Sequence, residues 1–175
     1  MSNFTDAKFW SAVFNSPIES GLRAVCILTE AYPSEFDLQR ILYYDYLVVH
    51  SSDIQDEFAD APPSIHPPTP NRASELTVRR ELCQIGLRLM ISRGLVACRF
   101  DKSGISYFAT ELALPFLDSL TSSYTSDLRD VARWLGQAFS DYSDSDLSGL
   151  IQANLGRWGA EFVMQSTVNE EGLSS

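Results

Sequence analysis

Two segments near the start of the chain carry apolar side chains at helical spacing. The first runs from Pro17 to about Ala31, where Ser16 can cap the first amides and a proline suits the first helical position. The second begins after Ser34, another candidate cap, and runs to about His50. Along one stripe of this second segment lie Leu38, Ile41, Leu42, Asp45 and Val49. The pattern therefore predicts two helices joined by a short turn.

The longest periodic segment runs from about Ala73 to Ser92. Its apolar residues fall on one broad arc of the helix, made of Leu76, Val78, Leu82, Cys83, Ile85, Gly86, Leu87, Leu89 and Met90. The opposite arc is polar and holds Thr77, Arg80, Glu81, Gln84 and Arg88. The width of the apolar arc predicts a helix that is mostly buried.

A β-hairpin follows the third helix, which ends at Arg93-Gly94. Residues 96–100 and 105–109 form two short strands around Asp101-Lys102-Ser103-Gly104, and Gly104 is expected to adopt a positive φ. The order helix, helix, long helix, hairpin is that of a winged helix, in which the hairpin is the wing.

Three further helices are expected after the hairpin. Pro115 favours a short one, Ser126 or Asp127 begins the next, and Asp146 begins the last. The polar residues 166–175 are expected to form a flexible tail. The fold class predicted is therefore mainly α with a small β-hairpin, in a single domain of residues 1–165. Its winged-helix-like core spans about 16–120 and its C-terminal helices about 126–165.

Residues 51–72 lack helical periodicity and contain Pro62, Pro63, Pro67, Pro68 and Pro70. This density of proline excludes a helix and favours extended backbone. Ile65 and His66 among the prolines suggest anchors, which indicate an ordered connecting loop. A disordered linker is the alternative.

Composition limits the function classes. The chain has 175 residues and a formal charge of -10, which disfavours a general nucleic-acid binder or a protein that coats anionic membranes. The net charge is -7 over residues 1–70, +4 over 71–110 and -7 over 111–175, so any contact with a polyanion must be local. Three widely spaced cysteines, the lack of an export signal and the lack of a membrane-spanning apolar run indicate a soluble cytoplasmic protein.

Candidate catalytic and cofactor sites are few. The chain has no phosphate-binding glycine-lysine loop, no nucleophile elbow and no zinc-protease histidine pair. Residues 144–149 imitate the start of a calcium loop, but Leu155 stands where the closing carboxylate would be, which favours a helix cap. We therefore expect no enzyme activity, no cofactor and no metal. His50 and His66 could act together, but structural histidines are the simpler interpretation.

Two charged residues lie on apolar helix faces. Asp45 is at the centre of the stripe in the second helix and Arg79 lies within the arc of the third. Because a buried unpaired charge is costly, either the two form a structural ion pair or each holds loop backbone. Arg80 and Arg88 lie on the polar arc that a winged-helix reader inserts into DNA, with Arg99 and Lys102 on the wing. This polar arc has two interpretations: it reads DNA directly, or it is a solvated or protein-binding face.

Several strings resemble a known family over residues 16–139: DYLVVHS (45–51), PSIHPPTPNR (63–72), ELTVRR (75–80), RGLV (93–96) and GISY (104–107). Together they resemble the small middle component of ABC three-component systems, a group that includes the Lamassu-type anti-phage and anti-plasmid systems.

The resemblance implies a non-catalytic adaptor in a prokaryotic defence complex. Such an adaptor would join an SMC- or ABC-like ATPase subunit, which senses foreign DNA, to an effector subunit, often a nuclease, that stays inactive until the signal arrives. It would meet DNA only indirectly or weakly, and no membrane. His50, His66, Arg72, Arg80 and Arg88 are the candidate partner-binding or loop-locking residues. The alternatives are a stand-alone winged-helix transcription regulator and, less favoured, an enzyme.

Overall fold

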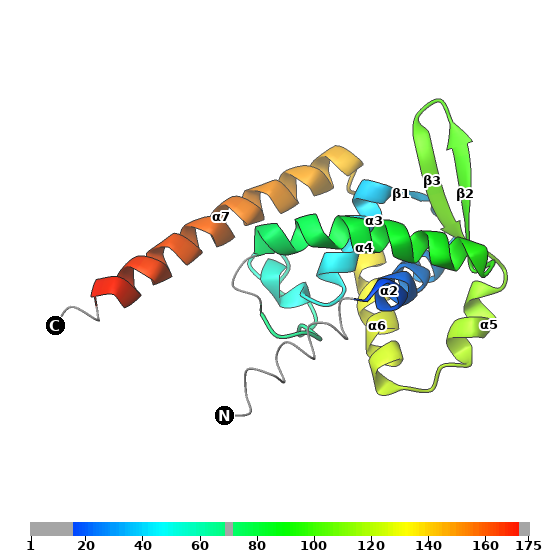
Figure 1. The fold of residues 1–175 in the computed structure, drawn as a ribbon, viewed down its shortest axis with the longest axis horizontal. Coiled ribbons are helices and arrows are strands. Elements are labelled where there is room, and N and C mark those ends of the chain that lie inside the picture. Colours follow the sequence, from blue (N-terminus) through cyan, green and yellow to red (C-terminus); the bar gives the residue numbers. More distant parts are fainter. Residues whose placement is uncertain (1–15, 69–71, 172–175) are drawn as a thin grey trace.

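The computed structural model describes the backbone of residues 16–68 and 72–171 and, among these, the side chains up to Arg157 other than that of Ala73. The described elements are α2 (Pro17–Glu30), β1 (Phe36–Asp37), α3 (Leu38–Leu47), η1 (Ser51–Ile54), α4 (Arg72–Ser92), β2 (Val96–Asp101), β3 (Gly104–Ala109), α5 (Ala113–Asp118), α6 (Ser123–Ala138) and α7 (Asp144–Glu171). The prediction of a mainly α-helical protein with a small β-hairpin is confirmed, and a third strand, β1, which the sequence did not predict, joins the hairpin in a small antiparallel sheet (Figure 1).

The first helix starts as its sequence indicates, and the second does not. The Ser16 side chain accepts a hydrogen bond from the amide of Glu19, with Pro17 as the first helical residue. In α3 the cap is Asp37, whose side chain accepts from the amide of Arg40, so the expected cap at Ser34 was wrong. The helix starts later because Phe36 and Asp37 form strand β1 instead.

The sheet has three antiparallel strands in the order β1-β3-β2. The hairpin pairs Val96 with Ala109 at its base and Asp101 with Gly104 at its tip, and Gly104 has the expected positive φ of 128°. The Asp101 carboxylate accepts hydrogen bonds from the amide and hydroxyl of Ser103, which stabilises the turn. Strand β1 pairs Phe36 with Tyr107 and ties the start of α3 to the hairpin.

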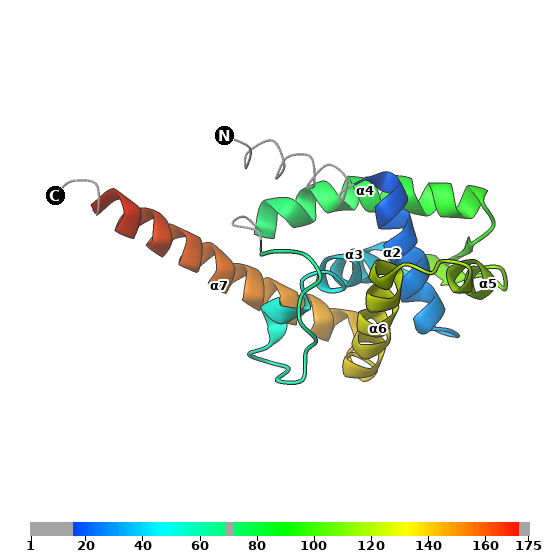
Figure 2. The same cartoon turned by 90° about the horizontal axis from the view of Figure 1, so that it is seen from below.

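Helix α2 runs through the centre of the core, where α4 crosses it (Figures 1 and 2). The two backbones meet at Gly21 and Gly86. A Cβ atom on Gly86 would lie 2.6 Å from the amide nitrogen of Gly21 and 2.7 Å from the carbonyl oxygen of Pro17. Only glycine therefore allows this close crossing.

The prediction that α4 is mostly buried was wrong. Val78 is 61% exposed and Ile85 40% exposed, although both belong to the predicted apolar arc. The buried face is made of Leu76, Arg79, Cys83, Gly86, Leu87 and Met90, which occupy one side of the predicted arc, while Val78 and Ile85 occupy the other. Both faces are compatible with the helical wheel. The contact with α2 selects the first, since it requires Gly86 at the crossing.

The C-terminal helices begin earlier than predicted. Helix α6 starts at Ser123 because Ser122, rather than Ser126 or Asp127, caps it. Helix α7 starts at Asp144, with the Ser143 hydroxyl accepting from the amide of Asp146 and the Asp146 carboxylate accepting from the amide of Ser143. This reciprocal cap accounts for the calcium-like spacing of residues 144–149.

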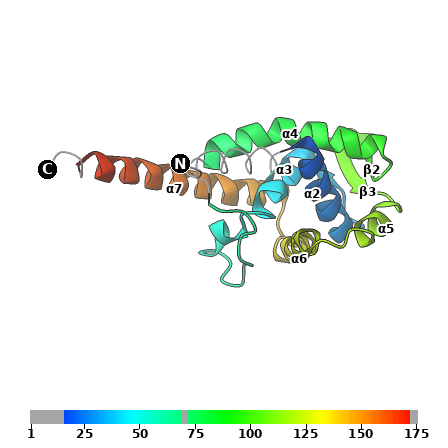
Figure 3. The same ribbon diagram turned by 60° about the horizontal axis from the view of Figure 1, so that its bottom comes forward.

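Helix α7 continues to Glu171, so the expected flexible tail from residue 166 is helical as far as that residue, and residues 172–175 lie outside the described part. No proline or glycine interrupts residues 165–171, which lets the helix continue. Its far end extends away from the other elements (Figure 3). Within the described residues, no helix combines the length and apolar character that crossing a bilayer requires.

Candidate functional site

A cluster of buried charges lies where α2, α3 and α4 meet. Asp45 of α3 is 0% exposed, and Arg23 of α2 and Arg79 of α4 are equally buried. Arg23 Nε donates to Asp45 Oδ1 at 2.7 Å, and Arg79 Nη1 donates to Asp45 Oδ2 at 2.9 Å. The structure thus brings Asp45 and Arg79 together, and places a second arginine opposite.

Two further carboxylates complete this group, which we call the buried ion-pair network. Glu19 pairs with Arg23 at 2.8 Å along α2, and Glu75 pairs with Arg79 at 2.6 Å along α4. Burial alone would raise the pKa of Asp45, but the positive charges of Arg23 and Arg79 outweigh it and lower that pKa. Asp45 is therefore ionised, and its charge is compensated inside the protein.

The network reaches α6 through a histidine and a tyrosine. His66 Nε2 lies 3.0 Å from Tyr124 Oη, and the Tyr124 hydroxyl donates to the carboxylate of Glu19. Burial, together with the charges of Arg23 and Arg79, lowers the pKa of His66 to about 4. His66 is neutral at physiological pH, and because the tyrosine proton goes to Glu19, His66 donates from Nε2. Burial also raises the pKa of Glu19.

The described part of the proline-rich loop, residues 51–68, is joined to the same network. The His66 amide donates to the carbonyl of Val49 at 3.0 Å, and the amide of Ser64 donates to the hydroxyl of Ser52 at 2.8 Å. His50 Nε2 lies 3.1 Å from Glu75, and the rings of His50 and His66 are 6.0 Å apart. These bonds close the loop on itself and attach it to the residues that follow α3 and, through His66 and Tyr124, to α6, while His50, just before the loop, contacts α4.

Arg72 closes the loop from the other side. Its Nε and Nη2 atoms each lie 3.0 Å from an oxygen of Asp53, which makes a two-pronged ion pair. Asp53 also accepts from the hydroxyl of Tyr46 at 2.5 Å. Arg72 therefore ties the first turn of α4 to η1 and α3.

Sequence reasoning missed Arg23, the second partner of Asp45. The signal was present, because Arg23 stands in an otherwise apolar run, Leu22 to Leu28, where a charged residue has no exposed face to occupy. Tyr124 had no comparable signal. Its role depends on α6 packing against α2, a contact between residues more than 100 positions apart.

The basic residues proposed for DNA reading differ in their surroundings. Arg80 donates to the side-chain oxygen of Gln39 at 2.9 Å, and Arg99 pairs with Glu35 at 2.9 Å. Arg88 on α4 and Lys102 in the hairpin turn are exposed. Half of this set is therefore already engaged within the chain.

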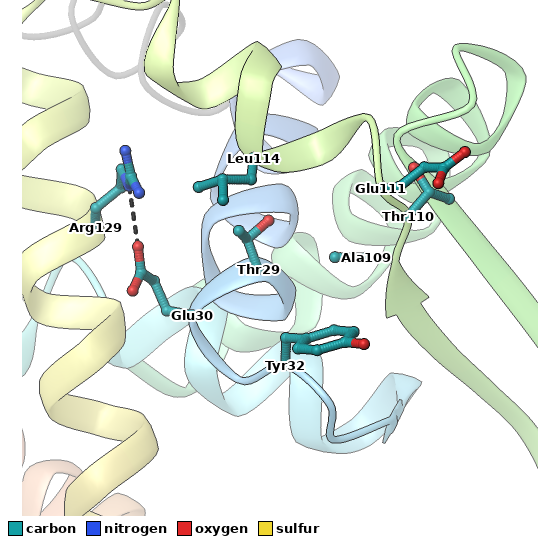
Figure 4. A pocket seen from close by; sticks show the side chains of 8 residues that line it. All are labelled: Thr29, Glu30, Tyr32, Ala109, Thr110, Glu111, Leu114 and Arg129. Carbon is teal, nitrogen blue, oxygen red and sulfur yellow. Dashed lines mark hydrogen bonds and ion pairs between the residues drawn. The ribbon is translucent and has the colours of Figure 1, made fainter.

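One hollow of about 470 Å³ lies between α2, α5, α6 and the end of β3 (Figure 4). Its lining consists of Thr29, Glu30, Tyr32, Ala109, Thr110, Glu111, Leu114 and Arg129. On one side Arg129 Nε binds Glu30 at 3.0 Å, and the aromatic ring of Tyr32 lies across from Leu114. The size falls within the range of small-ligand pockets, but the ion pair already satisfies the strongest polar groups.

The chain was compared with models of known protein families. Residues 13–161 match the family described as ABC-three component (ABC-3C) system Middle Component 2. Comparison with curated proteins and with solved structures gives no significant match. The matched range contains every residue of the buried ion-pair network.

Proposed function

The chain belongs to the family of ABC-three component system Middle Component 2, and from that premise we propose that it is the adaptor subunit of a prokaryotic defence complex. In this proposal the chain bridges an SMC- or ABC-like ATPase subunit and an effector subunit, which in some systems is a nuclease. It does no chemistry itself, acts in the cytoplasm and helps to keep the effector inactive until foreign DNA is sensed. We also propose that this complex is of the Lamassu type.

One observation carries the proposal beyond family membership: the interior charges join elements to one another. Asp45, Arg23 and Arg79 are closed off from solvent, and each charge already faces an opposite one. Groups held in this way are unsuited to bind or activate a substrate. They connect α2, α3, α4 and the loop into one unit, which suits a subunit that passes a conformational signal between partners.

The element order supports a winged-helix arrangement for residues 17–109. Helix α2, strand β1, helices α3 and α4, and the hairpin follow one another along the chain, and β1 pairs with β3 rather than β2. We infer that this module is used as a scaffold for protein contacts. The connection between α3 and α4 runs from residue 48 to residue 71, far longer than the short turn of a DNA-binding helix-turn-helix.

A stand-alone transcription regulator is the second candidate, and exposed Arg88 and Lys102 are the observation in its favour. Against it, the chain carries a net charge of -10, and Arg80 and Arg99 have partners within the chain. We expect the isolated protein to bind duplex DNA at or beyond the weak end of the usual non-specific range of about 10⁻⁴ to 10⁻⁶ M. Fluorescence anisotropy with labelled duplexes measures this, and a sequence-dependent sub-micromolar complex would favour the regulator.

The experiment that tests the adaptor proposal is co-expression of the chain with the other two components of its own ABC-3C system. The tagged chain should retain both the ATPase subunit and the effector during affinity purification and size-exclusion chromatography. Omitting the chain should separate the other two. An ATPase and effector that associate equally well without it would contradict bridging.

A further inference from the structure

Helix α4 carries an apolar row that the described elements leave partly uncovered. Val78 is 61% exposed and Ile85 40% exposed, and Leu82 and Leu89 are only partly buried. These four residues stand at positions i, i+4, i+7 and i+11, so they form one continuous row along the helix, which we call the α4 stripe. This spacing is typical of a surface that packs against another amphipathic segment. Single exposed apolar side chains are ordinary, but a continuous row indicates a docking surface.

The start of the described chain lies beside this stripe. A Cβ atom on Gly86 would lie 2.7 Å from the carbonyl oxygen of Pro17, the first residue of α2. Gly86 follows Ile85 directly and stands within one turn of Leu82 and Leu89. Residues 1–15, which lie outside the described part of the chain, therefore join the molecule within a few residues of the stripe.

The composition of residues 1–15 suits such a surface. The segment contains only two charged residues but four aromatic ones, which are Phe4, Phe9, Trp10 and Phe14. Phe9, Trp10, Val13 and Phe14 stand at i, i+1, i+4 and i+5, which places them on one face if the segment is helical. Two apolar surfaces thus stand next to each other in the same chain, and each removes apolar area from water if it covers the other.

We infer that residues 4–14 of this chain dock on the α4 stripe. The segment is long enough, because 11 helical residues span roughly 16 Å and the distance along α4 from Ile85 to Val78 is roughly 10 Å. The covalent connection at Pro17 also favours this occupant over a separate molecule, since a short link gives an effective concentration in the millimolar range. This inference does not depend on the adaptor proposal. It identifies the stripe as an internal contact, which partner subunits would not reach while the segment is bound.

The test follows the exposure of Trp10 in the full chain. The chain has three tryptophans, so Trp134→Phe with Trp158→Phe leaves Trp10 as the one reporter and serves as the reference protein. Acrylamide quenching and the emission wavelength of Trp10 are measured in the reference protein, before and after unfolding in urea. A docked Trp10 is shielded from acrylamide, whereas a solvated one is quenched as in the unfolded chain.

Two double variants of the reference protein probe the stripe. The stripe variant is Val78→Gln with Ile85→Gln, and the matched control is Phe100→Thr with Ile105→Thr, an exposed apolar pair on the hairpin. Glutamine suits a helix and threonine suits a strand, so circular dichroism should show an intact fold in both.

A third double variant, Phe9→Gln with Phe14→Gln, removes the other side of the proposed contact. If the two sides touch, the stripe variant and this variant should lower the melting temperature by amounts that do not add when they are combined. Fully additive losses would overturn the inference.

Quenching of Trp10 should be weak in the reference protein, rise toward the value of the unfolded chain in the stripe variant, and stay weak in the control. A Trp10 that is as easily quenched in the reference protein as in the unfolded chain would overturn the inference. Shielding that survives in the stripe variant would also overturn it, because another surface would then hold the segment.

Two other occupants of the stripe are distinguished by the same proteins. Shielding of Trp10 that increases with protein concentration would assign the stripe to a second copy of the chain. A stripe variant that binds the ATPase or effector subunit more weakly, while Trp10 stays shielded, would assign the stripe to a partner. Either result would overturn the inference and leave the adaptor proposal standing.

Discussion

Replacing Arg79 tests the buried ion-pair network most directly. Arg79 makes two hydrogen bonds to Asp45, one to the carboxylate and one to the backbone carbonyl, and two to the carboxylate of Glu75. Arg79→Ala removes all four and leaves Asp45 buried with one arginine fewer. Breaking a buried ion pair from one side costs about 3 to 5 kcal/mol, and we expect a loss of that size in the free energy of unfolding. With a total stability of about 5 to 15 kcal/mol, such a loss is large.

Two comparison variants separate the charge from the volume. Arg80→Ala changes the neighbouring, exposed arginine, which donates a hydrogen bond to Gln39, and should cost less than about 0.5 kcal/mol. Arg79→Met keeps a long side chain and removes only the charge and its donors. It should retain most of the loss, because Asp45 remains ionised and buried. Urea unfolding followed by circular dichroism gives the three free energies.

The pH dependence has a definite sign. The pKa of Asp45 is lowered in the folded state, so the stabilisation from this carboxylate is present above its unfolded pKa of about 4 and is lost as the pH falls through the folded value. The difference between wild type and Arg79→Met should therefore be largest at neutral pH and shrink below about pH 4. Small and equal losses for Arg79→Ala and Arg80→Ala at pH 7 would refute the reasoning.

Three further outcomes are expected. Gly86→Ala should lower the free energy of unfolding by about 2 kcal/mol or more in urea titrations, because the added Cβ meets backbone of α2. The control Gly149→Ala adds a Cβ that meets nothing within 4 Å, and it should be neutral or slightly stabilising. His66 has a pKa lowered to about 4 in the folded protein, so it stays neutral there, but in the unfolded chain it is protonated below about pH 6.5. The free energy of unfolding of the wild type should therefore fall by about 2 kcal/mol from pH 7 to pH 4, and His66→Gln should make it less dependent on pH. The double variant His66→Ala with Arg72→Ala should free the loop, which would appear as faster amide exchange over residues 51–68, and should weaken complex assembly if the loop faces a partner. A folded double variant with unchanged exchange, assembly and activity would show that the segment is only a spacer.

Local sequence by itself determined most of the secondary structure. Ser16 and Pro17 start α2, and the turn residues Asp101 to Gly104 build the hairpin, because caps and turns depend on neighbours within a few positions. The ion pair between Asp45 and Arg79 could also be anticipated. A charge on an apolar stripe needs an opposite charge, and few candidates exist.

Only the tertiary structure decided which faces are used. The helical wheel of α4 accommodates Val78 and Ile85 on a buried face as well as Leu76 and Leu87, and the close contact with α2 at Gly86 selects the latter. Tertiary packing also decides that the two-residue strand β1 forms, that Arg23 is the second partner of Asp45, and that Tyr124 lies beside His66. Each depends on residues far apart in sequence being packed together, and a local pattern contains no information about which distant element will supply the contact.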